Sequence, residues 1–247
     1  MITSSQNIQV KDWRKLQTKK YRVNTQSFLI EGFHLIEEAL NSGWTIATII
    51  VQEGTTLPNW LTEQNHQLVS KQVFAAISQT EAPQGIAAVV KMPQVQPISG
   101  DYLLLIDQVQ DPGNLGTMIR TADAAGFSQV VLGKGTVDLY NDKVIRASQG
   151  SIFHIPVVEA DLLELIPQLQ QQTYRVLASA LDNAVSYAAA SNLNKAALVM
   201  GNEGSGINPG ILKLADQCIK IPIYGQAESL NVSVAAGILM YQMRQPV

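Results

Sequence analysis

The sequence contains one cysteine, Cys218, and only three histidines among its 247 residues. A single cysteine excludes an internal disulfide and a thiolate metal cluster. The histidines stand far apart, at positions 34, 66 and 154, and lack the close spacing of metal ligands. We therefore expect no metal site.

Long hydrophobic runs are also missing. No apolar run reaches the roughly 18 residues that a membrane-spanning helix requires. The first residues, MITSSQN, are polar and do not resemble the apolar segment of a secretory signal. We expect a cytoplasmic protein that does not associate with membranes.

Neither positive nor negative residues are in large excess. The net charge is −3, and only 15% of the residues are charged. The whole chain therefore has no basic signature of nucleic-acid binding. Its N-terminal segment differs, since only Asp12 opposes a cluster of basic residues: Lys11, Arg14, Lys15, Lys19, Lys20 and Arg22. Such a cluster can follow a phosphate backbone, or it can be the solvated face of a helix.

Helix and strand patterns alternate along the chain and indicate two α/β domains. Residues 1–25 are expected to form a basic helix or arm, and apolar residues over 28–40 have near-helical spacing. Residues 91–100 contain Pro93 and Pro97 and are typical of a semi-rigid linker. We place the domain boundary between residues 98 and 99. The alternation after it predicts a mostly parallel sheet over 99–247.

Three longer motifs concentrate glycine and polar residues beside apolar segments. They are DQVQDPGNLGTMIRTADAAG at 107–126, LVMGNEGSGI at 198–207 and IPIYGQAESLNVS at 221–233. The glycines fit neither the dinucleotide-binding fingerprint nor the phosphate-loop motif, which argues against a Rossmann dehydrogenase or P-loop enzyme. The third motif predicts a strand over 218–224, a loop, and a helix that Ser229 or Asn231 would cap.

Together, the three motifs resemble the SpoU (TrmH-like) family of the SPOUT RNA methyltransferases. The resemblance implies transfer of a methyl group from S-adenosylmethionine to a ribose 2′-hydroxyl of ribosomal or transfer RNA. It also implies an α/β fold whose C-terminal parallel sheet carries a deep trefoil knot. A small L30e-like α/β domain for RNA substrate binding is expected before it, because FLIEG at 28–32 and PQGI at 83–86 match its landmarks. RNA is the expected partner, and DNA is not.

The same resemblance assigns roles to individual residues. The expected catalytic residues are Asn114, Arg120, Glu203, Ser229 and Asn231. The expected cofactor-binding residues are Gly201, Ile221, Leu230 and Ser179. The expected RNA-binding residues are Lys15, Lys19, Lys20, Lys143 and Arg146.

The role of Arg120 has two interpretations. The ribose hydroxyl must lose a proton, so the reaction needs a base, but an arginine with a pKa above about 12 is a poor base. A substrate phosphate or neighbouring dipoles could help Arg120 accept the proton. Alternatively, Arg120 positions the phosphate and stabilises the oxyanion, which we favour on physical grounds. Glu203 is expected to fix Arg120 or Asn231 or to bond the ribose, and Asn114 to cap its helix or contact the ribose.

Two further hypotheses compete with an RNA methyltransferase. The chain could be a catalytically inactive RNA-binding module of the same fold, against which the five intact catalytic positions argue. A small-molecule methyltransferase has no use for the basic N-terminal segment. We also expect a homodimer through the C-terminal domain, because the helix from residue 231 is apolar on too many sides for one monomer.

Overall fold

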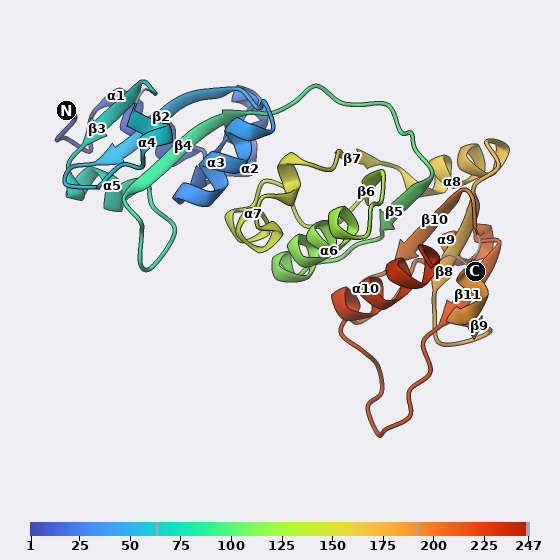
Figure 1. Ribbon diagram of the computed structural model, residues 1–247. Helices are drawn as coiled ribbons and strands as arrows, with labels where there is room; N and C mark the ends of the chain where they lie inside the picture. Colours follow the sequence, from blue (N-terminus) through green and yellow to red (C-terminus); the bar gives the residue numbers. More distant parts are fainter. Residues whose placement is uncertain (63, 192, 246–247) are drawn as a thin grey trace. The chain divides into compact units, whose positions relative to one another are not determined.

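The computed structural model describes residues 1–62, 64–191 and 193–245, and the chain forms two compact units (Figure 1). The first unit comprises Met1–Gln94 together with Tyr140–Phe153. The second comprises Val95–Leu139 together with His154–Val247. Each unit has its own sheet and its own hydrophobic core.

The first unit is built on a sheet with the strand order β1-β4-β2-β3. The strands are β1 (Ser27–Glu31), β2 (Ile46–Gln52), β3 (His66–Val69) and β4 (Ile86–Lys91). β4 pairs antiparallel with β1 and β2, whereas β2 and β3 are parallel. The helices are α1 (Ile8–Lys15), α2 (Lys19–Thr25), α3 (Phe33–Asn41), α4 (Asn59–Thr62) and α5 (Lys71–Ile77). The unit is thus a small α/β domain, as the alternation of patterns predicts.

The sequence predicts a helix over residues 28–40. This prediction is wrong for the first part of that range, which forms β1. Phe28 and Ile30 are buried, and their backbone pairs with β4. Burial of successive residues on both faces of a strand hides the alternation that would identify it in the sequence. Gly32, with φ of 105°, separates this strand from α3, which begins at Phe33.

A segment from the middle of the chain completes the first unit. Residues Tyr140–Phe153 contain α7 (Asp142–Ser148) and the 3-10 helix η1 (Ser151–Phe153). The rings of Tyr140 and Phe28 lie 4.4 Å apart, and Trp44 donates from Nε1 to the Phe153 carbonyl at 3.1 Å. The boundary expected at 98/99 leaves this segment in the second domain, because contacts between distant aromatic residues leave no local pattern.

The second unit is built on a parallel sheet with the order β7-β6-β5-β10-β8-β11-β9, which confirms the parallel α/β sheet predicted for this part of the chain. Its strands are β5 (Tyr102–Ile106), β6 (Gln129–Gly133), β7 (Val157–Ala160), β8 (Arg175–Ser179), β9 (Val185–Ser186), β10 (Ala196–Met200) and β11 (Gln217–Lys220). β5, β6 and β10 are buried over nearly their whole length. Such burial is typical of parallel strands covered by helices on both faces.

Helices cover both faces of this sheet. Leu103 and Leu105 of β5 belong to a core cluster with α8 (Leu162–Gln171) and α9 (Pro209–Leu214). Alternation along the strand directs Leu104 to the opposite face. There α6 (Pro112–Ala124) and α10 (Val232–Met243) pack against each other, as Figure 1 shows in green and red. A further 3-10 helix, η2 (Tyr187–Ala190), contacts α10.

The segment between β11 and α10 differs from its prediction. The strand expected over 218–224 ends at Lys220, and residues 221–231 form an open loop. Pro222 has no backbone N–H and cannot continue the ladder. The helix α9 was not expected from the sequence. Within the described residues, no helix is both long and apolar enough to cross a membrane.

Candidate active site

A cavity of about 400 Å³ lies at the carboxyl ends of β8, β10 and β11. Ser179, Met200 and Lys220 are the last residues of these three strands, and all three line the cavity. Parallel strands end at the same edge of a sheet, where open α/β folds usually bind their ligands. The strand order therefore creates the cavity from segments that are distant in the sequence.

The cavity brings together most of the predicted site residues. The four expected cofactor residues line it: Ser179, Gly201, Ile221 and Leu230. Three expected catalytic residues line it as well: Glu203, Ser229 and Asn231. Gly201 leaves no room for a side chain, because a Cβ there would lie 2.5 Å from the backbone of Gly206. The turn after β10 must therefore fold tightly back onto the strand end.

A chain of hydrogen bonds joins three of the predicted catalytic residues at the edge of this cavity. Asn231 donates from Nδ2 to Oδ1 of Asn114 at 3.0 Å. Asn114 in turn donates from Nδ2 to Oε1 of Glu203 at 3.1 Å. Both ends of the Asn114 amide are engaged, so its orientation is fixed.

The Glu203 carboxylate anchors the loop that leads into α6. Besides Asn114, it accepts from the backbone N–H groups of Gln110 at 3.2 Å and Asp111 at 3.1 Å. Partial burial opposes ionisation, but these hydrogen bonds outweigh it and hold the pKa of Glu203 below its ordinary value. The lone pairs of the Glu203 carboxylate are thus largely committed to groups of the protein.

Helix α6 places Asn114 in its first turn. Asp111 is the N-cap, since its side chain accepts from the Asn114 backbone N–H at 2.8 Å. Pro112 occupies the first helical position, where a missing N–H has no cost. The expectation that Asn114 caps the helix is therefore wrong. Because Asp111 fills that role, the Asn114 side chain remains available for Glu203 and Asn231.

Asn231 is the N-cap of α10, as expected. Its Oδ1 accepts from the backbone N–H groups of Ser233 at 2.9 Å and Val234 at 3.3 Å. Its Nδ2 is left to reach Asn114, so one side chain both starts α10 and joins it to α6. Ser229 precedes the cap, is exposed and lines the cavity.

Arg120 lies apart from this arrangement. It follows Asn114 by six residues, about 1.7 helical turns, so the two side chains leave α6 in different directions. Arg120 is exposed and does not line the cavity, and its side chain has no hydrogen bond or ion pair within the described part of the chain. Of the contacts expected for Glu203, that with Arg120 is not formed, and that with Asn231 is made through Asn114.

Two polar residues that line the cavity, Asn202 and Lys220, were not among the site residues predicted from the sequence. Asn202 donates from Nδ2 to the Gln108 carbonyl at 2.8 Å, while its Oδ1 accepts from the backbone N–H groups of Gly204 and Ser205. It therefore ties the loop after β10 to the loop after β5. An asparagine two residues before a glycine is a recognisable turn signal. Lys220 has no such signal and is identified only by its position at the end of β11.

The predicted RNA-binding residues all lie in the first unit, on α1, α2 and α7. Lys15 is paired with Asp12 at 2.9 Å, which raises the pKa of the Lys15 ammonium. Arg22 is buried and donates to the Leu16 carbonyl at 2.7 Å, so this member of the basic cluster faces inward.

On α7, Lys143 is exposed. Arg146 is paired with Asp142 one turn earlier, at 2.5 Å. The Asp142 carboxylate therefore offsets part of the positive charge that α7 offers to a phosphate.

Comparison with known proteins identifies the family of this chain. Residues 101–241 match the model of the SpoU rRNA Methylase family, and residues 7–88 match the MRM3-like substrate binding domain. The chain is 49% identical to 23S rRNA (guanosine(2553)-2′-O)-methyltransferase RlmP of Bacillus subtilis, over 98% of both chains.

Solved structures are similar over nearly the whole chain. The AdoMet-bound rRNA methyltransferase from Sinorhizobium meliloti has a TM-score of 0.85 and 32% identity, covering 98% of this chain and 96% of that one. The SpoU methyltransferase AviRb from Streptomyces viridochromogenes, in complex with AdoMet, has a TM-score of 0.84 and 25% identity over 97% of each chain. This chain belongs to the SpoU rRNA methylase family.

Proposed function

We propose that this protein transfers a methyl group from S-adenosylmethionine to a ribose 2′-hydroxyl of ribosomal RNA. One observation carries the proposal: the hydrogen-bonded chain Asn231–Asn114–Glu203 stands at the edge of the cavity that the predicted cofactor residues line. The relative from Bacillus subtilis supports ribosomal over transfer RNA, since that protein is a 23S rRNA 2′-O-methyltransferase.

The cavity suits S-adenosylmethionine. Its volume of about 400 Å³ falls within the roughly 300–1,000 Å³ of pockets that enclose small molecules. Gly201, Gly204 and Gly206 lie in its wall, and residues without side chains let backbone N–H and C=O groups approach a ligand closely. Backbone at Gly201, Ile221 and Leu230, with Ser179, would hold the nucleoside part. When bound, the cofactor supplies the methyl group.

The remaining residues position the acceptor. Methyl transfer requires in-line alignment of the acceptor oxygen, and alignment supplies a large part of the rate enhancement. Asn114 and Asn231 hold each other in fixed orientations, and Glu203 holds Asn114 and the loop before α6. Ser229 orients the acceptor nucleotide from the cavity wall. We assign Glu203 a positioning role, because its carboxylate already accepts from Asn114 and from the backbone N–H groups of Gln110 and Asp111.

Arg120 stabilises charge on the acceptor. Its exposed guanidinium is available to a substrate phosphate and to the developing oxyanion. Arg120 would therefore act through its positive charge and not as a base. Because Arg120 does not line the cavity of its own chain, we place it at an acceptor site that two subunits share.

A dimer through α10 would create such a site. Val234, Ile238 and Tyr241 are 52%, 37% and 53% exposed. Their spacing of four and three residues sets them along one face of α10. The opposite face, with Leu239 and Met240, is already buried against the sheet and α6. A symmetric partner would cover the apolar stripe.

The trefoil knot expected for the family is part of the same proposal. β10 lies between β5 and β8, β11 lies beyond β8, and α10 returns to pack on α6. The loops that follow β10 and β11 line one cavity. This order of strands and loops supports a chain that passes through its own loop at residues 198–233.

The two domains have different roles in the proposed reaction. Residues 1–98 bind structured RNA through Lys15, Lys19 and Lys20, and residues 99–247 carry out the transfer. Lys143 and Arg146 add contacts to the RNA from α7. Both substrates are cytoplasmic, and we place the protein there.

The test is methyl transfer to RNA that lacks the modification. Tritiated S-adenosylmethionine is incubated with the purified protein and with ribosomal or transfer RNA from a deletion strain. Label in ribosomal RNA at a single alkali-resistant linkage is the expected result, because a 2′-O-methyl group blocks hydrolysis of the next bond. Binding of RNA without turnover would instead identify an inactive RNA-binding module.

A further inference from the structure

Two landmarks of the first unit, FLIEG at 28–32 and PQGI at 83–86, meet at the start of α3. Gln84 accepts at Oε1 from the Phe33 backbone N–H at 3.0 Å. Gly32 permits this approach, because a Cβ there would lie 3.2 Å from the Gln84 oxygen and its φ of 105° disfavours other residues. The methyl-transfer chemistry of the second unit uses neither landmark.

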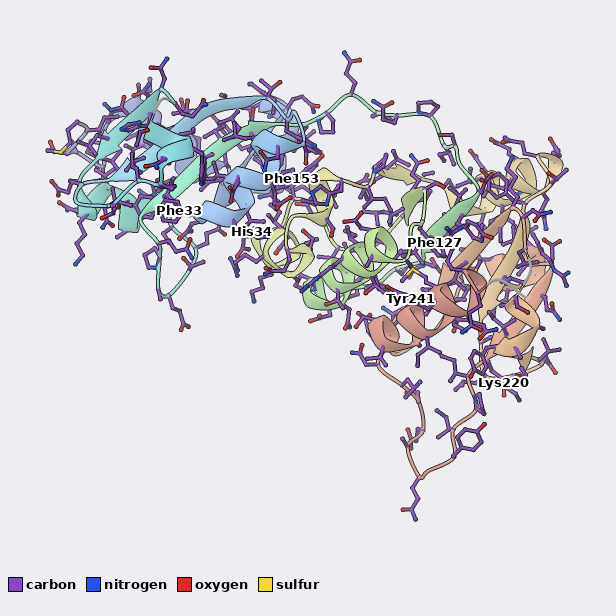
Figure 2. The ribbon with its side chains drawn as sticks, viewed as in Figure 1. Phe33, His34, Phe127, Phe153, Lys220 and Tyr241 are labelled. Atoms are coloured by element: carbon purple, nitrogen blue, oxygen red, sulfur yellow. The ribbon has the colours of Figure 1, made fainter. Side chains whose placement is uncertain are left out.

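A cavity of about 240 Å³ opens beside this junction, and residues of the first unit alone line it. Its polar lining residues are Glu31, His34, Thr80, Gln84, Arg146 and Gln149. This volume is smaller than the roughly 300–1,000 Å³ of pockets for drug-sized ligands, and it suits a single planar ring system. His34 stands at the start of α3 (Figure 2). Its Nε2 donates to the Gln149 carbonyl at 3.2 Å, which ties α3 to the end of α7.

The hydrogen-bonding groups of the wall are held in place. The Glu31 carboxylate accepts from Ser78 Oγ at 2.8 Å, from the Gln79 backbone N–H at 3.2 Å, and from Thr80 Oγ1. A carboxylate has about four acceptor positions, so Glu31 retains one. Gln84 uses its oxygen for Phe33, which leaves its Nε2 donors unused among the described residues.

The charges of the cavity favour a neutral ligand. The Asp142 carboxylate pairs with Arg146 at 2.5 Å and offsets its positive charge. The Glu31 carboxylate adds a second negative charge. A phosphate would meet this carboxylate, whereas a nucleobase offers both donors and acceptors in one plane. Binding of a peptide side chain usually requires an apolar pocket. Leu35 and Ala82 are the only apolar side chains among the described lining residues, so the cavity does not suit a peptide.

We propose that this cavity binds one unpaired base of the RNA substrate. Proteins read RNA sequence mainly at splayed bases, which they bond along their edges and stack on aromatic rings or guanidinium planes. The cavity supplies edge partners from Glu31 and Gln84 and planar groups from His34 and Arg146. The inference rests on the proposed function, since it assumes that RNA is the substrate.

Substitutions in the full-length protein test the cavity. Gln84→Glu keeps the oxygen that accepts from Phe33 but removes the Nε2 donor, and His34→Ala removes a planar group without adding charge. Each should raise the KM for ribosomal RNA from a deletion strain about tenfold, the factor expected for a lost base contact. The kcat and the affinity for S-adenosylmethionine should not change. Gln64→Glu, at an exposed position of the same unit, is the matched control for the added charge.

Salt dependence and cross-linking separate the possible ligands. A base contact leaves the slope of log affinity against log salt unchanged in His34→Ala, whereas a lost phosphate contact flattens it. Ultraviolet cross-linking of the same RNA should label peptides that line the cavity in the wild type and not in Gln84→Glu.

An unchanged KM in both variants, or a flattened slope, would overturn the base-binding site while methyl transfer by the wild type still stood. Absence of RNA methylation by the wild type would overturn the proposed function instead.

Discussion

Asn231 and Asn114, which are 117 residues apart in the sequence, bond to each other through their side-chain amides at 3.0 Å. Asn231 starts α10 and Asn114 lies in the first turn of α6, so the bond joins the beginnings of two helices on one face of the sheet. Because Glu203 holds the other end of the Asn114 amide, the three residues act as one unit.

Substitution of Asn231 should separate stability from activity. Asn231→Asp keeps the oxygen that caps α10 but replaces the donor to Asn114 with an acceptor. Its melting temperature should stay near that of the wild type, while kcat falls roughly a hundredfold because the acceptor groups lose their alignment. Asn231→Ala should lose both activity and about 1 kcal/mol of stability through the missing cap. Thermal denaturation and methyl-transfer kinetics measure the two effects, and equal activity in Asn231→Asp and the wild type would contradict this role.

Removal of the Glu203 carboxylate should abolish the alignment of the groups that hold the acceptor, without unfolding the protein. Glu203→Ala releases Asn114 and the N–H groups of Gln110 and Asp111, so we expect a fall in kcat of roughly a hundredfold. Glu228→Ala, an exposed carboxylate in the loop before α10, is the matched control and should keep activity within about twofold. Circular dichroism checks folding. Full activity of folded Glu203→Ala would remove this residue from the mechanism.

The low pKa of Glu203 predicts a dependence of stability on pH. A carboxyl group whose pKa is lower in the folded state stabilises that state above its unfolded pKa, about 4.3 for glutamate. This stabilisation is lost as the pH falls through the folded pKa. The difference in melting temperature between the wild type and Glu203→Gln should be constant above about pH 5 and shrink toward pH 3. A constant difference across the whole range would show that ionised Glu203 does not stabilise the fold.

The basic N-terminal helices should contribute to RNA affinity unequally. Lys20→Ala should weaken binding and flatten its salt dependence by a slope of about 0.7–0.9 if one phosphate contact is lost. Lys15→Ala should have a smaller effect, because Asp12 already offsets the charge of Lys15. Lys71→Ala, an exposed lysine at the start of α5, is the control. Filter binding at several salt concentrations distinguishes these outcomes, and identical slopes in all variants would make the cluster an ordinary solvated surface.

A charge on the exposed stripe of α10 should separate the proposed dimer. Ile238→Glu should give the monomer mass of 26.9 kDa in light scattering, and methyl transfer should be lost because the shared acceptor site is incomplete. Leu163→Glu places the same charge at an exposed apolar position of α8, on the other face of the sheet, and should leave the dimer intact. A wild-type protein that is monomeric while active would overturn the shared site.

The amino-acid sequence by itself determined much of the local structure and the identities of the site residues. Apolar runs such as 196–200 specify buried parallel strands, and Asn231 before an apolar run specifies the start of α10. Three motifs, each read locally, contained three of the four expected cofactor residues and four of the five expected catalytic residues that meet around one cavity or its hydrogen-bonded edge. The fourth cofactor residue, Ser179, lies outside the motifs, at the end of β8.

Tertiary structure decided which of these residues touch. Whether Glu203 reaches Asn114 or Arg120 depends on how the loops after β5 and β10 approach each other. The assignment of Tyr140–Phe153 to the first unit likewise depends on contacts with Phe28 and Trp44. Sequence patterns report the periodicity of neighbouring residues, whereas these contacts join distant segments and follow from the strand order of the folded sheet.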